Sequence, residues 1–319
     1  MLDGLQVLIL VIGGLNGFVG SNTTEALVEQ GFDCVVTRHE NAEVPKFLDK
    51  HLNRHVFVER VDATSVRDLQ AVGEKYKIDA IVGLAGGLAS TTGSPTPRLR
   101  AYFDMLASVF AVAEEWKVKR VLMSSSGGVY FGLSGTVNED HPVLLPSAWG
   151  LLAHLKIVEV AMSEFAKSGI DTVCVRLLGM FGPGQDQGVL PQRLVHAAVA
   201  GKHPDLHGVP FGNAEDSVDL MYIKDVGRAI ALLQKAEKLP HSIYNVCSGS
   251  PTSSREVLEA VKKAVPGFTA DLLKGRSPFP PLPVIDNGRL TTDTGFTPKY
   301  DIQSAVQDYA DWLRAGNPK

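Results

Sequence analysis

The chain has 319 residues, of which 45% are hydrophobic and 21% charged, and its 31 basic and 35 acidic residues give a net charge of −4. This composition is typical of a globular protein, and the lack of a basic run argues against binding to nucleic acid or to an anionic membrane. No apolar stretch is long enough for a transmembrane helix, and the N-terminal hydrophobic run lacks the basic leader of a signal peptide. We therefore expect a cytoplasmic protein with neither nucleic acid nor a membrane as partner.

The three cysteines lie far apart, each within an apolar, strand-like segment. This placement suits buried free thiols in a reducing compartment. We expect no disulfide bond among Cys34, Cys174 and Cys247, and no metal site in the protein.

The glycine-rich segment near the N-terminus is the most informative part of the sequence. Residues 7–20 read VLILVIGGLNGFVG, which predicts a strand, a tight turn and then a helix over residues 21–30. Glycines at this spacing permit the turn, the close approach of the main chain to a pyrophosphate, and helix packing on the strand. The helix N-terminus adds free N–H groups. A tight turn without a ligand is the alternative; otherwise the expected cofactor contacts are Gly14, Asn16, Gly17, Phe18, Val19 and Gly20.

Strand-like and helix-like segments then alternate along the chain, as in the βαβ units of a parallel sheet with helices on both faces. The helix-like segment 98–117 has apolar residues at the three-and-four spacing of a half-buried helix. The pattern predicts an α/β fold with a Rossmann-type, doubly wound parallel sheet. Its further strands are expected at residues 33–37, 56–61, 80–85, 120–124, 172–177 and 243–246.

Beyond Gly182 the pattern becomes less regular and richer in proline and glycine. We expect a dinucleotide-binding domain over residues 1–180 and a smaller substrate-binding lobe over 181–319, with some strands and helices returning to the first domain. Apolar loop residues of this lobe favour a small, weakly charged ligand, either aromatic or a short carbonyl compound, although such residues also pack a lobe. They are Phe211, Phe279, Pro280, Pro281 and Leu282.

The residue at the end of the second strand bears on the choice of cofactor. An acid there accepts hydrogen bonds from the 2′-hydroxyl of the adenosine ribose, but this sequence has Arg38. An arginine pairs instead with a 2′-phosphate, which favours NADP over the alternative, NAD; a solvent-facing arginine is the other interpretation. Asp62 is placed to meet the adenine edge. Other strand-end contacts are expected at Ala63, Leu84, Ala85, Gly86, Ser124 and Leu178.

Later motifs resemble those of one enzyme family. With SSSGGVY at 124–130, the chain resembles the extended short-chain dehydrogenases/reductases of the NAD-dependent epimerase/dehydratase group. RLLGMFGPG at 176–184 and DLMYIKDV at 219–226 match the family's R-x-x-N-V-Y-G-P-G and D-F-V-Y-V-D-D-V. YNVCSG at 244–249 and GFTP at 295–298 follow in the family's order. The resemblance spans nearly the whole chain and implies an NAD(P)-binding enzyme.

The resemblance also implies a catalytic serine, tyrosine and lysine. The tyrosine stands four residues before the lysine on one helix face, where the lysine and the nicotinamide ribose lower the pKa of the phenol. Ser126 matches the serine, and Lys156 is the only lysine of segment 147–159. Four residues before Lys156 stands Leu152, which has no proton to give. A second register, with Trp149 at the tyrosine position, supplies no lysine.

Other groups could replace the missing phenol. Tyr102, on the helix after the fourth strand, could lend its hydroxyl, with a core tyrosine as the alternative. His154 is about 200° around the helix from Lys156 and faces away from a lysine directed at the cofactor. Ser126 could instead bond its local backbone, and Lys156 could hold only the ribose. Tyr130 matches a family tyrosine that is normally structural.

The same comparison bears on substrate. Sugar-nucleotide members of the family have an arginine before the D-F-V-Y motif, where this sequence has Val218, although Arg276 could contribute a contact. We predict an NADP-binding enzyme that acts on a carbonyl or hydroxyl of a small non-nucleotide metabolite. The alternatives are a non-redox lyase or isomerase, and a catalytically decayed dinucleotide sensor.

Members of the family commonly dimerise through the helices after the fourth and fifth strands. The matching segments, 98–117 and 148–167, are amphipathic enough to allow a homodimer. The residues available for the outer face of the second are Leu151, Leu155 and Met162.

Overall fold

The computed structural model describes residues 7–15, 17–38, 43–85, 95–143, 156–186, 188–279 and 282–317. They form two compact units, each with a hydrophobic core. The first unit comprises residues 1–129, 145–176 and 227–244, and the second comprises residues 130–144, 177–226 and 245–319. None of the helices in these described ranges is long and apolar enough to cross a membrane.

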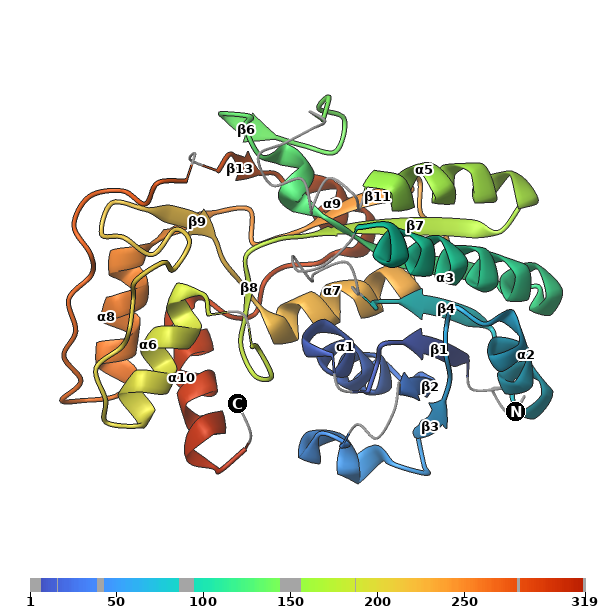
Figure 1. Ribbon diagram of the computed structural model, residues 1–319, viewed down its shortest axis with the longest axis horizontal. Coiled ribbons are helices and arrows are strands. Elements are labelled where there is room, and N and C mark those ends of the chain that lie inside the picture. The colour runs from blue at the N-terminus through green and yellow to red at the C-terminus, as the bar shows by residue number, and fades with distance from the viewer. Residues whose placement is uncertain are drawn as a thin grey trace. The chain divides into compact units, whose positions relative to one another are not determined.

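Within the described residues, a seven-stranded sheet has the order β11-β7-β5-β4-β1-β2-β3 (Figure 1). The pairs β3–β2, β2–β1, β1–β4 and β4–β5 are parallel. The predicted Rossmann-type parallel sheet is therefore confirmed, and each strand overlaps its predicted range. The strands are β1 (Leu8–Ile12), β2 (Asp33–Arg38), β3 (Val56–Arg60), β4 (Ala80–Gly83), β5 (Arg120–Ser126), β7 (Asp171–Leu177) and β11 (Ile243–Val246).

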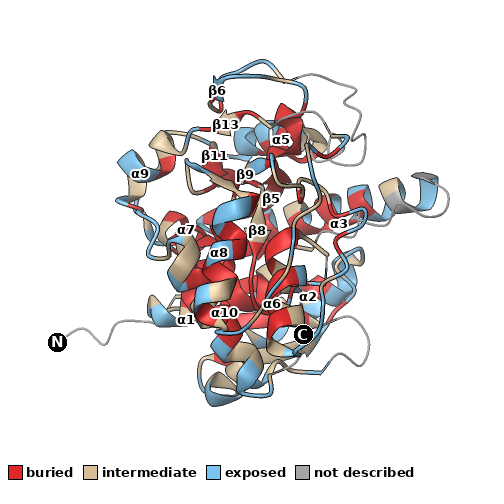
Figure 2. Ribbon diagram, turned by 90° about the vertical axis from the view of Figure 1, so that its left-hand side faces the viewer, coloured by how far each residue is buried: buried red, intermediate tan, exposed pale blue. Residues whose placement is uncertain are grey.

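Both faces of the sheet are covered. On one face, α2, α3 and α5 form a core with alternate strand residues such as Leu10 and Val121. The intervening residues, among them Ile9 and Val11, are fully buried as well. Figure 2 shows both buried and exposed residues along α3, as expected for a half-buried helix. The helices of this part are α1 (Phe18–Glu29), η1 (Lys46–His51), α2 (Val66–Lys75), α3 (Pro95–Trp116), η3 (Gly127–Tyr130), α5 (Lys156–Phe165), η4 (Ala166–Ser168) and α7 (Ile223–Lys235).

Helix α1 begins earlier than predicted. Gly17 is its N-cap and Gly20 lies inside its first turn, so the helix starts at Phe18 and not at residue 21. For the predicted helix over 148–167, the structure describes only the part from Lys156 onward, as α5 and η4.

Two predictions about side chains have different outcomes. The three cysteines are buried, as expected. Met162 was wrongly expected on the outer face of α5: it is 2% exposed and belongs to the core. The exposed apolar residue of α5 is Val160, at 59%, because positions two residues apart lie on nearly opposite sides of a helix.

The second unit is built around three helices, α6, α8 and α10, which share one core. A capping box of Ser253 and Glu256 begins α8, and Asp301 caps α10. Short strand pairs complete the unit. Its remaining elements are α6 (Leu190–Val199), α8 (Ser254–Ala264), α9 (Gly288–Thr294), α10 (Ile302–Arg314), β6 (Thr136–Val137) with β13 (Val284–Ile285), β8 (Met180–Phe181) with β10 (Met221–Tyr222), and β9 (Ser217–Asp219) with β12 (Pro251–Ser253).

The chain first passes from the sheet-containing unit to the second at residues 130–144, and again at Arg176–Leu177. Residues 227–244 return to the first unit and add most of α7 and the first half of β11. The division at 180 and 181 stays a prediction.

Candidate cofactor and active site

The glycine-rich loop follows β1 at the point where the strand order of the sheet reverses, which is where ligands bind in open α/β sheets. Gly13 has φ +78°, a conformation that favours glycine. A Cβ on Gly20 would lie 1.9 Å from Gly13 O, and one on Gly14 would lie 2.7 Å from Val11 Cγ1. The hydroxyl of Thr24 donates to Gly14 O at 2.9 Å. The packing of α1 on β1 therefore requires these glycines. Because they have no side chains, the main chain of the loop is open to close approach by a ligand.

The N-terminus of α1 offers hydrogen-bond donors. Its N-cap, Gly17, has no side chain to accept from the first turn, and that turn contains no acidic residue. The first N–H groups of a helix have no partner within the helix, so an anion such as a pyrophosphate satisfies them. Phe18 and Val19 are half-buried beside Gly17. Asn16 lies outside the described residues.

Arg38 is the last residue of β2. Its neighbour Thr37 accepts a hydrogen bond at Oγ1 from Gly13 N–H at 3.1 Å, which places this end of β2 beside the glycine loop. The Nε of Arg38 is buried and has no hydrogen-bond partner in the described part of the chain. Leaving a buried donor unpaired costs free energy, and an anion held by the guanidinium removes that cost.

Residues after β3 and β4 border the same end of the sheet. Asp62 Oδ1 accepts hydrogen bonds from Thr64 N at 2.9 Å and Thr64 Oγ1 at 2.7 Å, which shapes the turn into α2. Ala63 packs against the core. Leu84 N–H donates to Ile12 O at 2.9 Å, and a Cβ on Gly13 would lie 3.1 Å from Ala85 N. Gly86 lies outside the described residues.

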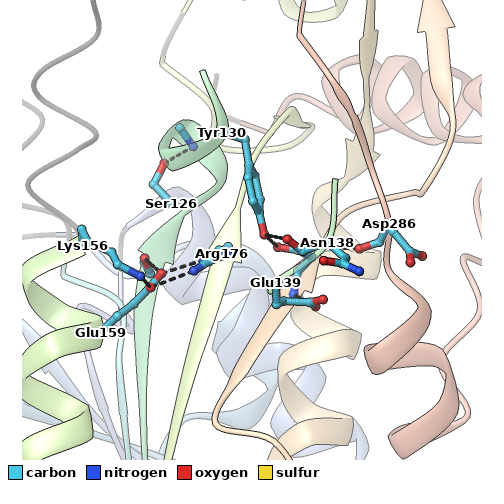
Figure 3. A network of polar contacts seen from close by, with 11 residues as sticks. Ser126, Tyr130, Asn138, Glu139, Lys156, Glu159, Arg176 and Asp286 are labelled. Carbon is cyan, nitrogen blue, oxygen red and sulfur yellow. Dashed lines mark hydrogen bonds and ion pairs between the residues drawn. The ribbon is translucent and has the colours of Figure 1, made fainter. Parts of the chain in front are cut away.

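The three serines at the end of β5 have different surroundings. Ser124 is half-buried. Ser125 Oγ donates to Glu159 Oε1 at 2.8 Å. Ser126, 5% exposed, accepts a hydrogen bond from Gly128 N–H at 3.0 Å (Figure 3). Accepting this bond supports the local-backbone interpretation of Ser126, yet it leaves the hydroxyl proton available for another acceptor.

Lys156 belongs to a buried ion cluster around Glu159. Its ammonium lies 2.5 Å from Glu159 Oε2, and Arg176 Nε and Nη2 donate to the same carboxylate at 2.7 and 2.9 Å (Figure 3). Burial alone would raise the pKa of Glu159, but Arg176 and Lys156 hold that pKa below its ordinary value. The structure thus directs Lys156 at Glu159.

The remaining candidates for the proton donor and cofactor contacts are Tyr102, His154 and Leu178. Tyr102 is 6% exposed in the core of α3, and burial, with a smaller effect of Cys174, raises the pKa of its phenol well above the ordinary value. This supports the core-tyrosine alternative. Leu178 is half-buried in the second unit. His154 and Leu152 lie outside the described residues, so the absence of a catalytic tyrosine stays a prediction.

The motif residues of the second unit hold its loops together. The hydroxyl of Tyr130 lies 3.0 Å from Asn138 O and 2.9 Å from Asn245 Oδ1 (Figure 3), in the structural role expected for this tyrosine. Glu139 accepts from Asn245 N at 2.7 Å. Asp219 accepts from the backbone N–H groups of residues 248 and 249, while burial raises its pKa.

The expected ligand-binding residues of the second unit partly come together. The rings of Phe211 and Phe279 are 5.4 Å apart between centroids. Val218 lies in β9, paired with Thr252 of β12. Arg276 is exposed. Pro280 and Pro281 lie outside the described residues, and Leu282 is half-buried.

Sequence reasoning missed one residue at the cofactor end of the sheet. Arg60 ends β3 and is the register partner of Arg38 in β2. Only the strand register, which a single sequence does not give, brings these two residues side by side.

The model of the "NAD dependent epimerase/dehydratase family" matches residues 9–247. The chain belongs to this family. It is an epimerase/dehydratase-type enzyme, in agreement with the resemblance of its motifs.

Similar proteins cover almost the whole chain. A putative UDP-glucose 4-epimerase of Methanocaldococcus jannaschii is 23% identical, over 97% of this chain and 99% of the relative. A bifunctional UDP-glucose 4-epimerase and UDP-xylose 4-epimerase of Pisum sativum is 24% identical, over 97% and 96%. The structure of a UDP-glucuronic acid 4-epimerase from Bacillus cereus in complex with NAD has a TM-score of 0.79 at 20% identity, over 97% and 99%. At these identities the solved structure shows a common fold.

Proposed function

We propose that the protein binds NADP(H) and acts on a carbonyl or hydroxyl of a small metabolite that carries no nucleotide diphosphate. The observation that carries the cofactor assignment is Arg38, whose buried Nε lacks a partner among the described residues beside the glycine loop. The bare main chain of that loop and the uncapped first turn of α1 fit a pyrophosphate. A nicotinamide dinucleotide bound there supplies the donor or acceptor of a hydride.

The other residues have separate roles in this proposal. Ser126 donates its hydroxyl proton in a hydrogen bond to the substrate oxygen, since the hydrogen bond that it accepts from Gly128 N–H leaves this proton available. Ser125, Glu159 and Arg176 fix the end of β5 against α5 and β7. Lys156, held by Glu159, has further N–H donors for a ribose hydroxyl.

The substrate assignment is supported by Val218, which leaves no cation at the position where sugar-nucleotide enzymes of the family have one. The pair Phe211 and Phe279 supports an apolar or aromatic group on the substrate. A sugar nucleotide is the second candidate, because relatives that cover nearly the whole chain are named for such substrates.

Calorimetric titration tests the cofactor assignment. Wild-type protein is expected to bind NADPH at least about tenfold more tightly than NADH, since charge-assisted hydrogen bonds are worth about 1.5–3 kcal/mol. Arg38→Gln should lose most of this preference and keep its affinity for NADH. Equal affinities of the wild type for both nucleotides would contradict the proposal.

A substrate panel tests the rest. Turnover of a non-nucleotide carbonyl compound with a change in nicotinamide absorbance supports the proposal, whereas tight binding of UDP or dTDP supports the sugar-nucleotide candidate. Conversion that leaves the nicotinamide unchanged, without UDP or dTDP binding, favours the non-redox alternative. Cofactor binding without any turnover favours the sensor.

A homodimer through α3 and α5 is the assembly we propose. Both helices expose large apolar side chains, Phe103 at 49% and Val160 at 59%. Phe110 of α3 stacks on Phe165 of α5, with centroids 4.2 Å apart, so the two helices form one surface.

A further inference from the structure

Two arginines lie side by side at the cofactor end of the sheet, one at the end of β2 and one at the end of β3. In the parallel pair β2–β3, the register runs Cys34↔Val56, Val36↔Val58 and Arg38↔Arg60. Register partners in neighbouring strands are about 4.8 Å apart and project their side chains from the same face of a sheet. The pairing continues past the strand ends, because Val61 N–H donates to Arg38 O at 3.2 Å.

No carboxylate of the described residues neutralises these two arginines. In the described part of the chain, neither guanidinium forms an ion pair or a hydrogen bond, and Arg38 Nε is buried. The nearby carboxylate of Glu59 is held by Lys75 Nζ at 2.8 Å and by Tyr76 at 3.0 Å. Like charges opposite each other on paired strands destabilise a sheet. A dianionic group bound between the two guanidiniums would attract both of them and so offset their mutual repulsion.

We propose that Arg60 is a second ligand of the cofactor's 2′-phosphate, so that Arg38 and Arg60 bind it together from two strands. This inference rests on the proposed preference for NADP(H). A phosphate carries nearly two negative charges and accepts bidentate hydrogen bonds, which suits two arginines better than one. The glycine loop next to β2 takes the pyrophosphate, and the 2′-phosphate lies farther along the sheet edge, toward β3.

The test measures affinities of Arg60→Gln for NADPH and NADH by calorimetry. We expect a loss of about 10–100-fold for NADPH, the size of a charge-assisted hydrogen bond, and a change below about twofold for NADH. Arg54→Gln is the matched control, since exposed Arg54 precedes the opposite end of β3. It should bind both nucleotides as the wild type does.

A fragment isolates the phosphate itself. Binding of 2′,5′-ADP should weaken in Arg60→Gln as NADPH binding does, while binding of 5′-AMP stays unchanged. In the double variant with Arg38→Gln, the two losses should not add, because both side chains contact one phosphate. Should Arg60→Gln fail to fold, Arg60→Lys, which keeps the charge but not the bidentate geometry, is expected to show a smaller loss confined to NADPH.

The outcomes separate the two proposals. A wild type without preference for NADPH overturns the proposed cofactor. A wild type that prefers NADPH, with Arg60→Gln equal to it, overturns only the role of Arg60. An equal loss for NADPH and NADH in Arg60→Gln and Arg60→Lys also overturns that role, because NADH has no 2′-phosphate.

Discussion

Glu159 is a buried carboxylate with charged groups on two sides. Arg176, whose side chain is 1% exposed, depends on it for charge neutralisation, and Ser125 and Lys156 complete its hydrogen bonds. Removing one partner of a buried ion pair costs more than the pair contributes, because the other charge stays buried. The cluster therefore constrains β5 directly next to Ser126.

We predict that Glu159→Gln lowers the free energy of unfolding by about 3 kcal/mol at pH 7. The pKa of Glu159 is lower in the folded protein than its ordinary value of 4.5. Its stabilising effect is therefore complete above pH 4.5 and is lost as the pH falls through the lower folded-state value. Urea unfolding at pH 7 and at pH 4 or below checks this, and the difference between variant and wild type should shrink at low pH.

A matched control lies on the same helix. Glu164 is 69% exposed and pairs with exposed Lys167, so Glu164→Gln should change stability by less than about 1 kcal/mol. Equal effects of the two substitutions would show that the cluster around Glu159 does not stabilise the fold as argued.

The site residues that the sequence predicts belong to local patterns, whereas those that it misses depend on contacts between distant segments. Arg38, Ser126 and the glycine loop follow recognisable local patterns. The pairing of Arg38 with Arg60 is set by the register of β2 and β3. Such a register depends on how two separate segments pack, so one sequence does not state it.

At the scale of elements, the close contact of α1 with the glycine loop is the feature that makes the cofactor site. Gly20→Ala places a Cβ against Gly13 O and must push α1 away from β1. We predict that it weakens NADPH and NADH binding alike, by about tenfold or more, since displaced helix N–H groups lose a charge-assisted hydrogen bond. Calorimetry with both nucleotides checks this.

Gly17→Ala is a graded comparison for that prediction. Its Cβ would lie 3.0 Å from the same oxygen, so a smaller shift is needed and a smaller loss is expected. Unchanged affinity in Gly20→Ala, or a loss confined to NADPH, would contradict the assigned role of the loop.

The long apolar strands were predictable because buried runs of four or more residues, with turn residues at each end, have few other interpretations. The start of α1 was not, because Gly17 and Gly20 have low helix propensity and read as a turn. The strands of the second unit have two or three residues each, too few to show a period. Their places depend on contacts between distant segments.

At the scale of the whole molecule, the chain crosses between its two units several times. The composition does not show that residues 130–144 belong to the second unit, because their partners, such as Asn245 and Asp286, are more than a hundred residues away. On α5, the side chain that faces outward is Val160, whereas Met162, which was predicted on the outer face, fills the core.

We predict that the exposed sides of α3 and α5 form the interface of a homodimer. Val160→Glu places a charge where the proposed interface excludes water, and an unpaired buried charge costs several kcal/mol. We expect wild type to sediment as a dimer and the variant as a monomer that still binds NADPH. Val66→Glu is the control, because Val66 is also exposed, at 37%, but lies on α2, and it should remain dimeric. A dimeric Val160→Glu, or a monomeric wild type, would place the exposed apolar residues of α3 and α5 outside any interface of this kind.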